Sequence, residues 1–545
     1  MTLATATRPS WRAPVVAAAA AFAAAVLWRF LTFSGFSNDH YVQVARGYQW
    51  LRGAWPVRDF VDPGMPATYA LSALGRLAFG NQLRSEFVVM VLGFGAGAAA
   101  TAWAAWRLAP SALIVAVVLA LEILVSPRTY SYPKILLYGI AGVAVVALAA
   151  SPTRRRVALC GVLIAAAFLV RHDHGLYIGL GCAAAVALRS GPVPVRLRGL
   201  ALIAAVTAAC LAPWAIAVQA AQGLAPYFHA GIEFSRREAE VSALRAWPAW
   251  SGIAWPLPVP SASAILYYFA YALPIVCAAI AWRRAVRGTA AWPGESAAVG
   301  GLALMALAVD RGFLRDPLAA RLPDVIVPAA LLGAWALGLA WHVPSRTIAG
   351  ASAGAALLGL VTVSAWRVGD VHSHLDDAGV FDGWRAIVSN GHDVAAELRR
   401  PQVDVERTPT RVSAALVPFF RYVARCTSDS DRLLVTGAYA DVFIAADRGF
   451  AGGVVSYQEG FYASEADQRE TIARLEREPV PFAVRIGVAE PIFTRGFPLV
   501  ASYVDARFAP LGEVALPQEE GVRLLVDRRR PARGTDPSTG WPCFR

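Results

Sequence analysis

Apolar runs of the length that crosses a lipid bilayer constrain this chain more than any other feature. Residues 13–27 and 86–106 contain almost no charge between their ends. A helical span needs about 20 apolar residues. The composition agrees, since 57% of the 545 residues are hydrophobic and 16% are charged. This excludes intrinsic disorder, argues against a purely soluble enzyme, and predicts a polytopic α-helical membrane protein.

About eleven such spans are expected from the apolar pattern. The first follows a basic N-terminal segment, as in a signal peptide. It continues to about Phe33 without a clean small-residue cleavage site, so we interpret it as a membrane span. The predicted spans cover 13–34, 86–106, 110–126, 135–151, 157–170, 175–189, 199–221, 263–282, 296–309, 323–342 and 347–366.

The short loops indicate the orientation. Residues 154–156 are all arginine, and 283–287 contain three more. Arginine and lysine gather in cytoplasmic loops. We therefore expect the N-terminus in the cytoplasm and, with an odd number of spans, the C-terminal region outside. The net charge of +12 is explained by this bias rather than by nucleic-acid binding.

The region from 367 has ordinary polarity. Apolar segments at 432–436, 482–486 and 522–526 are typical of buried strands, and 465–478 is a charged helical stretch. Together they predict a small α/β domain. The expected division is a membrane domain over 1–366 with its first outer loop at 35–85, a linker containing a helix over 367–410, an extracytoplasmic α/β domain over 411–530, and a tail over 531–545.

The cysteines fall into two groups. Cys426 and Cys543 both lie in the predicted outer domain, where oxidation occurs, so a disulfide between them is a hypothesis. The other four lie in predicted spans and are interpreted as small buried hydrophobic residues. No CxxC pair suggests a metal site.

The first outer loop holds the most informative residues. Asp39 stands where the first span leaves the bilayer, and Tyr41, Ala45, Tyr48 and Leu51 recur at helical spacing. This predicts a helix along the membrane surface. An ionisable residue at such a boundary is often functional. The alternative is a solvated carboxylate that caps the helix.

This loop resembles one known family. The pattern is Asp39, Tyr41, Gly53 and the segment Pro56-Val57-Arg58-Asp59-Phe60, followed by a proline-rich turn. It resembles the membrane glycosyltransferases of the GT-C fold, especially relatives of protein O-mannosyltransferases and of bacterial aminoarabinose and arabinofuranosyl transferases. The match is specific over 38–85. The resemblance implies a GT-C-like catalytic membrane domain in a bacterial-type plasma (inner) membrane.

The resemblance also implies roles for the acids of the loop. Asp39 corresponds to the catalytic base or to a neighbour of a metal ion, Asp59 to the second acid, and Asp62 to a supporting acid. Many relatives have two acids where this chain has Asn38 and Asp39, a departure that puts a metal ion at this point in doubt. The implied donor is a hexose or pentose on a polyprenyl phosphate.

Cations are needed to stabilise a departing phosphate. The loop 126–134 contains Arg128, Tyr130 and Lys134, the only lysine of the chain. Lys134 is predicted to bind phosphate as a compact point charge. The alternative is a lysine that extends to the membrane interface beside tyrosines. Arg311, in a later loop, is a further phosphate candidate.

The loop Arg171-His172-Asp173-His174-Gly175 separates two apolar runs. Arg171 and His172 resemble the basic residues that relatives carry at such a junction, so both are predicted to contact phosphate. Asp173 with the two histidines is a weaker candidate for a metal site, and a charged interfacial hairpin is the alternative. Tyr41, Tyr130, His174 and Glu233 are expected in an acceptor or sugar groove.

The function predicted from these residues is glycosyl transfer. Asp39 deprotonates an acceptor hydroxyl on an envelope glycan, lipid or protein, and the transfer inverts the anomeric centre. A divalent metal ion is an optional cofactor, and no nucleotide or redox cofactor is expected. Membrane lipids are expected partners, and nucleic acid is not. The alternatives are a membrane transporter, although Glu122 is the clear ionisable residue expected within the spans, and a non-catalytic cell-envelope assembly protein.

Overall fold

The computed structural model describes residues 12–80, 83–125, 127–243, 248–252, 254–315, 321–342, 348–400, 415–516 and 519–545. The predicted domain boundary at 410/411 lies outside these residues. The chain divides into two compact units. The helical unit comprises Met1–Thr32, Met90–Trp214 and Glu238–Gly391, and the mixed unit comprises Phe33–Val89, Ala215–Arg237 and His392–Arg545.

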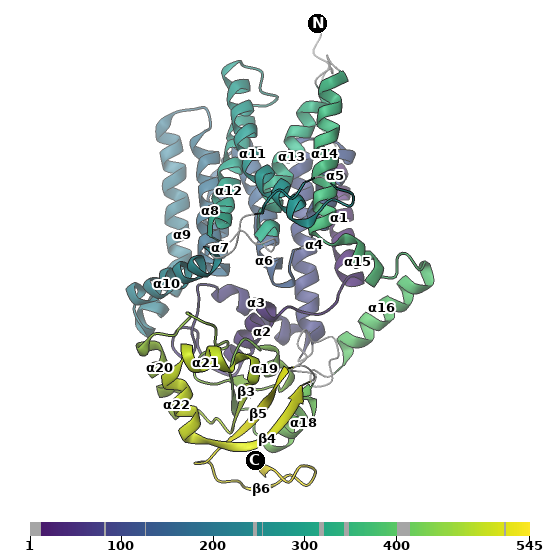
Figure 1. The fold of residues 1–545 in the computed structure, drawn as a ribbon. Coiled ribbons are helices and arrows are strands. Elements are labelled where there is room, and N and C mark those ends of the chain that lie inside the picture. The colour runs from purple at the N-terminus through teal and green to yellow at the C-terminus, as the bar shows by residue number, and fades with distance from the viewer. Residues whose placement is uncertain are drawn as a thin grey trace. The chain divides into compact units, whose positions relative to one another are not determined.

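The helical unit is a bundle of apolar helices (Figure 1). Its helices are α1 (Arg12–Leu31), α4 (Leu83–Leu108), α5 (Ala112–Leu124), η1 (Thr129–Ser131), α6 (Tyr132–Ala150), α7 (Arg154–Val170), α8 (His172–Ala187), α9 (Val193–Ala221), α11 (Val259–Val286), α12 (Glu295–Arg315), α13 (Leu322–His342), α14 (Ile348–Val368), α15 (Val371–Asp377) and α16 (Trp384–Arg399). Some of them begin or end in the mixed unit.

All eleven predicted spans coincide with helices of this bundle. Seven helices among the described residues are long and apolar enough to cross a bilayer, and the bent pair α14 and α15 makes eight if it counts as one span. The remaining three, α5, α7 and α8, have 13, 17 and 16 residues. The prediction of a polytopic helical membrane protein is confirmed, and these short helices explain the difference in number.

Small residues allow the helices of the bundle to approach closely. A Cβ atom on Gly139 of α6 would lie 2.6 Å from the carbonyl oxygen of Gly97 on α4. The glycines Gly181 of α8 and Gly301 of α12 meet in the same way, at 2.7 Å. Helices in a bilayer associate through such backbone contacts, because lipid removes the hydrophobic drive between them.

The mixed unit combines short helices with a sheet. Its helices are α2 (Asn38–Leu51), α3 (Pro66–Phe79), α10 (Leu224–Ala243, which ends in the helical unit), α18 (Val417–Cys426), α19 (Asp441–Ala445), α20 (Glu465–Arg477), η4 (Gly487–Ala489), α21 (Glu490–Gly496) and α22 (Pro498–Arg507). Its strands are β1 (Arg432–Val435), β2 (Gly449–Phe450), β3 (Phe482–Ile486), β4 (Phe508–Leu516), β5 (Glu519–Asp527), β6 (Gly534–Thr535) and β7 (Pro542–Cys543).

The main sheet has the order β2-β1-β3-β5-β4. Strands β2, β1 and β3 are parallel, and β5 pairs antiparallel with both β3 and β4. Strands β1, β3 and β5 match the three predicted strands, and α20 matches the predicted charged helix. The α/β nature of the C-terminal region is therefore confirmed.

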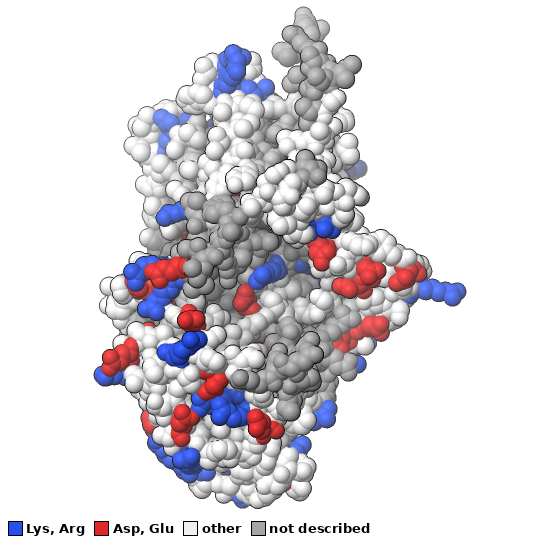
Figure 2. All heavy atoms as spheres, viewed as in Figure 1, with Lys and Arg blue, Asp and Glu red and all other residues white. Residues whose placement is uncertain are grey.

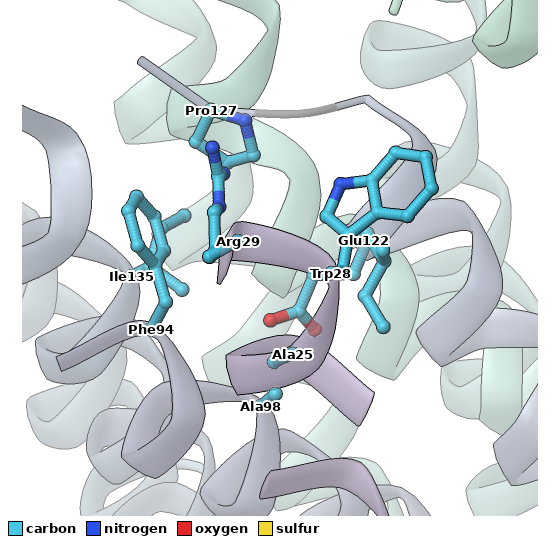
Figure 3. A pocket seen from close by; sticks show the side chains of 9 residues that line it. Ala25, Trp28, Arg29, Phe94, Ala98, Glu122, Pro127 and Ile135 are labelled. Atoms are coloured by element: carbon cyan, nitrogen blue, oxygen red, sulfur yellow. The ribbon is translucent and has the colours of Figure 1, made fainter. Parts of the chain in front are cut away.

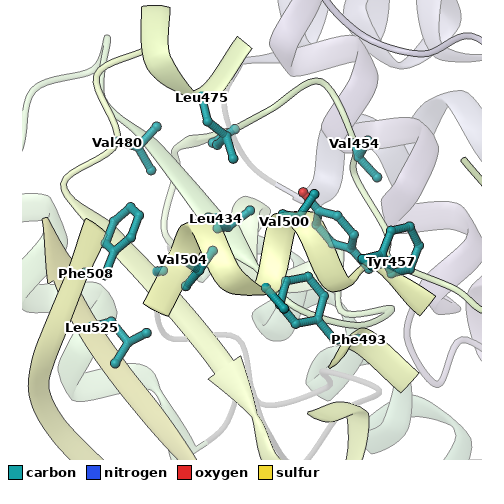
Figure 4. Close-up of a cluster of buried hydrophobic side chains, with 14 residues drawn as sticks. Leu434, Val454, Tyr457, Leu475, Val480, Phe493, Val500, Val504, Phe508 and Leu525 are labelled. Atoms are coloured by element: carbon teal, nitrogen blue, oxygen red, sulfur yellow. The ribbon is translucent and has the colours of Figure 1, made fainter. Parts of the chain in front are cut away.

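A hydrophobic core joins this sheet to its helices (Figure 4). Leu434 of β1 and Leu525 of β5 pack with Leu475 of α20 and with Val500 and Val504 of α22. The helix α20 begins with a capping box between Ser464 and Asp467, which satisfies two backbone donors at its first turn. The charged face that remains lies on the surface, and Figure 2 shows many charged side chains of both signs over this domain.

The tail is attached to α18. The structure joins Cys426 and Cys543 in a disulfide, with their Cα atoms 4.4 Å apart. The amide of Phe544 donates to the carbonyl oxygen of Cys426 at 2.8 Å. The Arg425 guanidinium donates to both oxygens of Asp536 at 3.1 Å. Residues 531–545 therefore belong to the mixed unit.

The first loop also belongs to the mixed unit. The amide of Ala440 donates to the Asn38 side chain at 3.0 Å, and Gln49 donates to the carbonyl oxygen of Phe450 at 3.2 Å. The Val61 amide donates to the carbonyl oxygen of Gly453 at 3.0 Å. The predicted division grouped 35–85 with 1–366, whereas these contacts group the loop with the C-terminal domain.

Candidate functional site

Asp39 lies in the first turn of α2, where the chain continues from the first membrane helix. Ser37 is the N-cap residue, and its side chain makes no capping hydrogen bond. The Asp39 side chain is exposed. A carboxylate in the first turn interacts favourably with the helix dipole. The N-cap position belongs to Ser37, so Asp39 lies two residues further into the helix than the predicted cap.

His40, the residue next to Asp39, is held by a buried contact with Glu86. His40 Nε2 lies 2.6 Å from Glu86 Oε1, and both side chains are only 1% exposed. The Ser72 hydroxyl donates to the same Glu86 oxygen at 3.0 Å. This contact joins the start of α2 to α3 and to the first turn of α4. The backbone that carries Asp39 is therefore fixed by a buried polar cluster.

The two other acids of the loop have partners of their own. Asp59 accepts hydrogen bonds from Arg58 and, at 2.7 Å, from the amide of Trp55. Partial burial raises the pKa of Asp59, but these two donors outweigh it and hold the pKa below its usual value. Both donors belong to the same turn, so the Asp59 carboxylate stabilises the turn that contains it.

Asp62 is buried and holds the turn before α3. Its Oδ1 accepts the amides of Gly64 and Met65, both at 3.0 Å, and its Oδ2 accepts the Tyr227 hydroxyl of α10 at 3.0 Å. Burial and the charge of Asp62 raise the pKa of Tyr227. Tyr227 was not singled out in the sequence, because nothing local links it to a residue so distant in the chain.

In the helical unit, Lys134 forms a buried ion pair with Asp324. The pair joins α6 to α13, and Lys134 is 5% exposed. Arg171 and Arg321 are close enough to act electrostatically on both residues of the pair. The ring of Tyr130 lies 5.5 Å from the ammonium group. Lys134 is therefore not a lysine extended to the membrane interface.

The expectation that Glu122 is the clear ionisable residue within the spans is wrong. Asp324 lies inside the predicted span 323–342, and its position alone was a signal, because ionisable residues in spans are rare and usually paired. Asp310 is a second buried acid within a span, in α12. The partner of Lys134 remained hidden because it lies 190 residues away in the sequence.

The Arg171 segment separates its side chains. Arg171 lies 3.0 Å from Asp173. The His172 ring stacks on Phe168 at 4.1 Å and packs edge-on against Trp214. The Tyr138 hydroxyl lies 2.6 Å from Nδ1 of His174, which is buried. The two histidines therefore have different partners.

Nε2 of His174 lies 3.8 Å from Asp173 Oδ1, but that oxygen also pairs with Arg171, and Nδ1 of His172 lies 2.7 Å from the carbonyl oxygen of Phe168. The three side chains therefore do not converge as ligands of one ion. Among the described residues, the group of acids, histidines and cysteines whose ligand atoms lie within 4.8 Å of one another is Cys426, Asp536 and Cys543. Its cysteines form the disulfide. No step below is assigned to a metal ion.

The other predicted residues are spread over both units. Arg128 is exposed at the start of η1, and Arg311 is exposed on α12. Tyr41 is buried within the mixed unit, and burial raises the pKa of its phenol. Glu233 pairs with Arg236 on α10 at 2.8 Å. Among the predicted phosphate ligands, Lys134 and Arg171 lie close enough to interact electrostatically.

A small cavity of about 20 Å³ lies between α1, α4, α5 and α6 (Figure 3). Arg29 and Glu122 both line it, and the Arg29 guanidinium lies 3.9 Å from the centre of the Phe94 ring. Glu122 Oε2 and Trp28 Nε1 have no hydrogen-bond partner among the described residues. A cavity of this size holds about one water molecule, so it is too small for a sugar or a lipid.

No protein-family model matches the chain, and no curated protein matches it. Among solved structures, the chain is similar to ArnT from Cupriavidus metallidurans, which was determined bound to undecaprenyl phosphate. The two are 13% identical, the alignment covers 92% of this chain and 97% of ArnT, and the TM-score is 0.49. These values are too low for residue roles to be transferred.

Proposed function

We propose that the protein transfers a sugar from a polyprenyl phosphate to an acceptor hydroxyl at the outer membrane surface. The observation that carries this proposal is the placement of Asp39. Its carboxylate is exposed at the first turn of α2, while its neighbour His40 is buried against Glu86. An exposed base on a fixed backbone is what general base catalysis requires.

The reaction is a single displacement. Asp39 accepts the proton of the acceptor hydroxyl, whose oxygen attacks the anomeric carbon as the bond from that carbon to the phosphate oxygen breaks. Polyprenyl phosphate leaves with the bonding electrons, and the anomeric configuration inverts. A base positioned in this way contributes about 10²–10⁴-fold to the rate.

Cations of the helical unit would stabilise the leaving phosphate. Lys134, Arg171 and Arg321 interact with one another electrostatically, and Asp324 and Asp173 neutralise part of their charge. Three cations against two carboxylates leave an excess of positive charge. Because Lys134 is held by Asp324, we assign direct phosphate contact to Arg171, with Arg311 and Arg128 as exposed alternatives.

The orientation follows from the arginine-rich loops. We infer that the start of α7 and the end of α11 face the cytoplasm. The first carries Arg154–Arg156, and the second carries Arg283 and Arg284 and is followed by Arg287. The C-terminal α/β domain is then extracytoplasmic, where its disulfide is stable. We propose a bacterial-type plasma membrane, and an envelope glycan, lipid or protein as the acceptor.

The test is turnover of purified protein in lipid nanodiscs with a panel of polyprenyl-phosphate sugars. Asp39→Asn should reduce turnover by about 10²–10⁴-fold without changing the thermal unfolding temperature. Glu465→Gln, which removes an exposed carboxylate from the first turn of α20 in the same unit, is the matched control and should keep its activity. Turnover of Asp39→Asn at the wild-type rate would show that the assignment is wrong.

A transporter is the second candidate. The buried pair of Lys134 and Asp324 and the contact between Tyr138 and His174 are the kind of polar groups that mark transport paths within membranes. Proteoliposomes distinguish the two functions. Substrate uptake that is lost in Asp324→Asn and kept in Asp39→Asn would favour transport over glycosyl transfer.

A further inference from the structure

Arg46, near the middle of α2, is a buried cation that forms no ion pair with the part of the chain that the structure describes. Its side chain is 6% exposed, and its Nε has no hydrogen-bond partner among the described residues. The other buried arginines of the mixed unit contact carboxylates. Arg448 pairs with Asp429, Arg485 with Glu490 and Arg507 with Asp527. Arg46 is the exception in this comparison.

The surroundings of Arg46 are polar, and they include the buried hydroxyl of Tyr69, which has no hydrogen-bond partner among the described residues. Its charge acts on Tyr69 of α3 and on Tyr462, where it opposes the rise in pKa that burial causes. Asp62 acts on the same two tyrosines. However, Asp62 already accepts three hydrogen bonds, from two backbone amides and Tyr227, and does not form an ion pair with Arg46.

A second unsatisfied group lies one turn away on the same helix. Gln43 is 8% exposed, and its Oε1 has no hydrogen-bond partner among the described residues. Residues three apart on a helix share a face. Arg46 therefore offers donors without an acceptor, and Gln43 offers an acceptor without a donor. A ligand that carries an oxyanion and a hydroxyl satisfies both.

Burying an uncompensated charge costs free energy, and a guanidinium fits the oxygens of a carboxylate or a phosphate. We propose that Arg46 and Gln43 bind an anionic group, a phosphate or a carboxylate, of the sugar acceptor. This inference rests on the proposed function, because it takes Asp39 as the base that receives the proton of the acceptor.

The spacing along α2 defines the acceptor further. Asp39, Gln43 and Arg46 occupy one side of the helix, since four and seven residues correspond to about one and two turns. Seven residues span about 10 Å along the axis. The acceptor should therefore carry its anionic group roughly 10 Å from the hydroxyl that is glycosylated. A neutral acceptor leaves Arg46 uncompensated and should be a poor substrate.

The anion site is tested first without any turnover. Inorganic phosphate should raise the unfolding temperature of the wild type in nanodiscs by about 2–4 °C, with sodium chloride as the ionic-strength control. Arg46→Met should lose this shift, and Asp39→Asn should keep it. Arg507→Met, which removes a paired arginine, is the matched control and should unfold at a lower temperature yet keep the shift.

The loss of the phosphate shift in Arg46→Met with its retention in Asp39→Asn supports the anion site even if no sugar is transferred. An equal shift in the wild type and in Arg46→Met would overturn it. Should Arg46→Met fail to fold, Arg46→Lys keeps the charge but loses the planar fork, and it should show a reduced shift.

The second measurement separates the acceptor from the donor. Where turnover is found, Arg46→Lys should raise the KM for a phosphorylated or carboxylated acceptor by roughly 30-fold. It should leave kcat and the KM for the donor within about twofold, since Arg46 does not take part in the chemical step. Phosphorylated and carboxylated acceptors, compared side by side, identify the anion.

A raised KM for the donor would assign Arg46 to the polyprenyl phosphate instead and overturn the proposal. So would equal use of neutral and anionic acceptors by the wild type. Failure of the proposed function looks different, since in that case no acceptor is glycosylated while the phosphate shift still depends on Arg46.

Discussion

Each unit contains a buried cation, and the two cations have opposite surroundings. In the helical unit, Lys134 lies between membrane helices and is neutralised by Asp324 on another helix. In the mixed unit, Arg46 is buried to a similar degree but contacts no carboxylate among the described residues. Ionisable residues within membrane spans are rare and usually paired. Arg46 lies outside the candidate spans, and in our proposal its ligand supplies the missing negative charge.

The largest effect is expected when Lys134 loses its counter-ion and is left, like Arg46, as a buried cation without a carboxylate among the described residues. Asp324→Asn leaves the ammonium group buried without its partner, so we expect a loss of about 3–5 kcal/mol in stability. Thermal unfolding in nanodiscs measures it. The double variant Lys134→Met/Asp324→Leu removes both charges and should recover most of the loss. A single variant as stable as the wild type would contradict the buried ion pair.

A disulfide cross-links the mixed unit, whereas close packing between helices stabilises the helical unit. Cys426→Ser opens a link between residues 117 apart, and the expected loss is about 2–4 kcal/mol. Cys277→Ser, in the helical unit, is the matched control. Reduction should lower the unfolding temperature of the wild type and leave that of Cys426→Ser unchanged.

Close backbone contacts at glycine occur between helices of the mixed unit as well as in the helical unit. Gly47 of α2 faces α3, and an added Cβ would lie 2.5 Å from the carbonyl oxygen of Tyr69. Gly47→Ala should therefore push the two helices apart and cost about 1–3 kcal/mol. It should also weaken the phosphate shift that depends on Arg46. Gly53→Ala, whose Cβ would meet nothing within 4 Å, separates this clash from backbone strain.

The smallest effect is expected at the tail. Hydrogen bonds from Arg425 and Ser538 lower the pKa of Asp536 below its usual value. A carboxyl with a lowered pKa in the folded state stabilises the protein above its unfolded pKa of about 4 and loses that contribution as the pH falls further. Asp536→Asn should remove this dependence. Thermal unfolding between about pH 2 and 5 checks it, and identical profiles would contradict the role of Asp536.

The sequence predicts what is local and misses what is distant. Apolar runs place all eleven helical segments, and alternating strands and helices predict the α/β domain, because hydrophobic periodicity is a local signal. The pairing of Lys134 with Asp324, and of Asp62 with Tyr227, depends on how the helices pack. The disulfide between Cys426 and Cys543 is an exception, because the chemistry of two cysteines in one oxidising compartment links them without knowledge of the packing.

The same limit applies to the candidate site. Asp39 and Arg171 stand at the ends of apolar runs, where a polar residue is conspicuous. Arg46 is surrounded by ordinary helical sequence, and only its burial without a counter-ion distinguishes it. The predicted roles of Asp39, Lys134 and Arg171 in transfer remain predictions until turnover is measured.

The hydrogen bond from Gln49 to Phe450 has a consequence for biosynthesis. Its two ends are 401 residues apart, and translation proceeds at about 5–20 residues per second. The ribosome therefore needs roughly 20–80 s after making Gln49 before Phe450 exists. The helix that carries Asp39 completes its contacts only when synthesis is almost finished. A chain released early could form the local contact between His40 and Glu86, yet it would lack the contacts of α2 with the C-terminal domain.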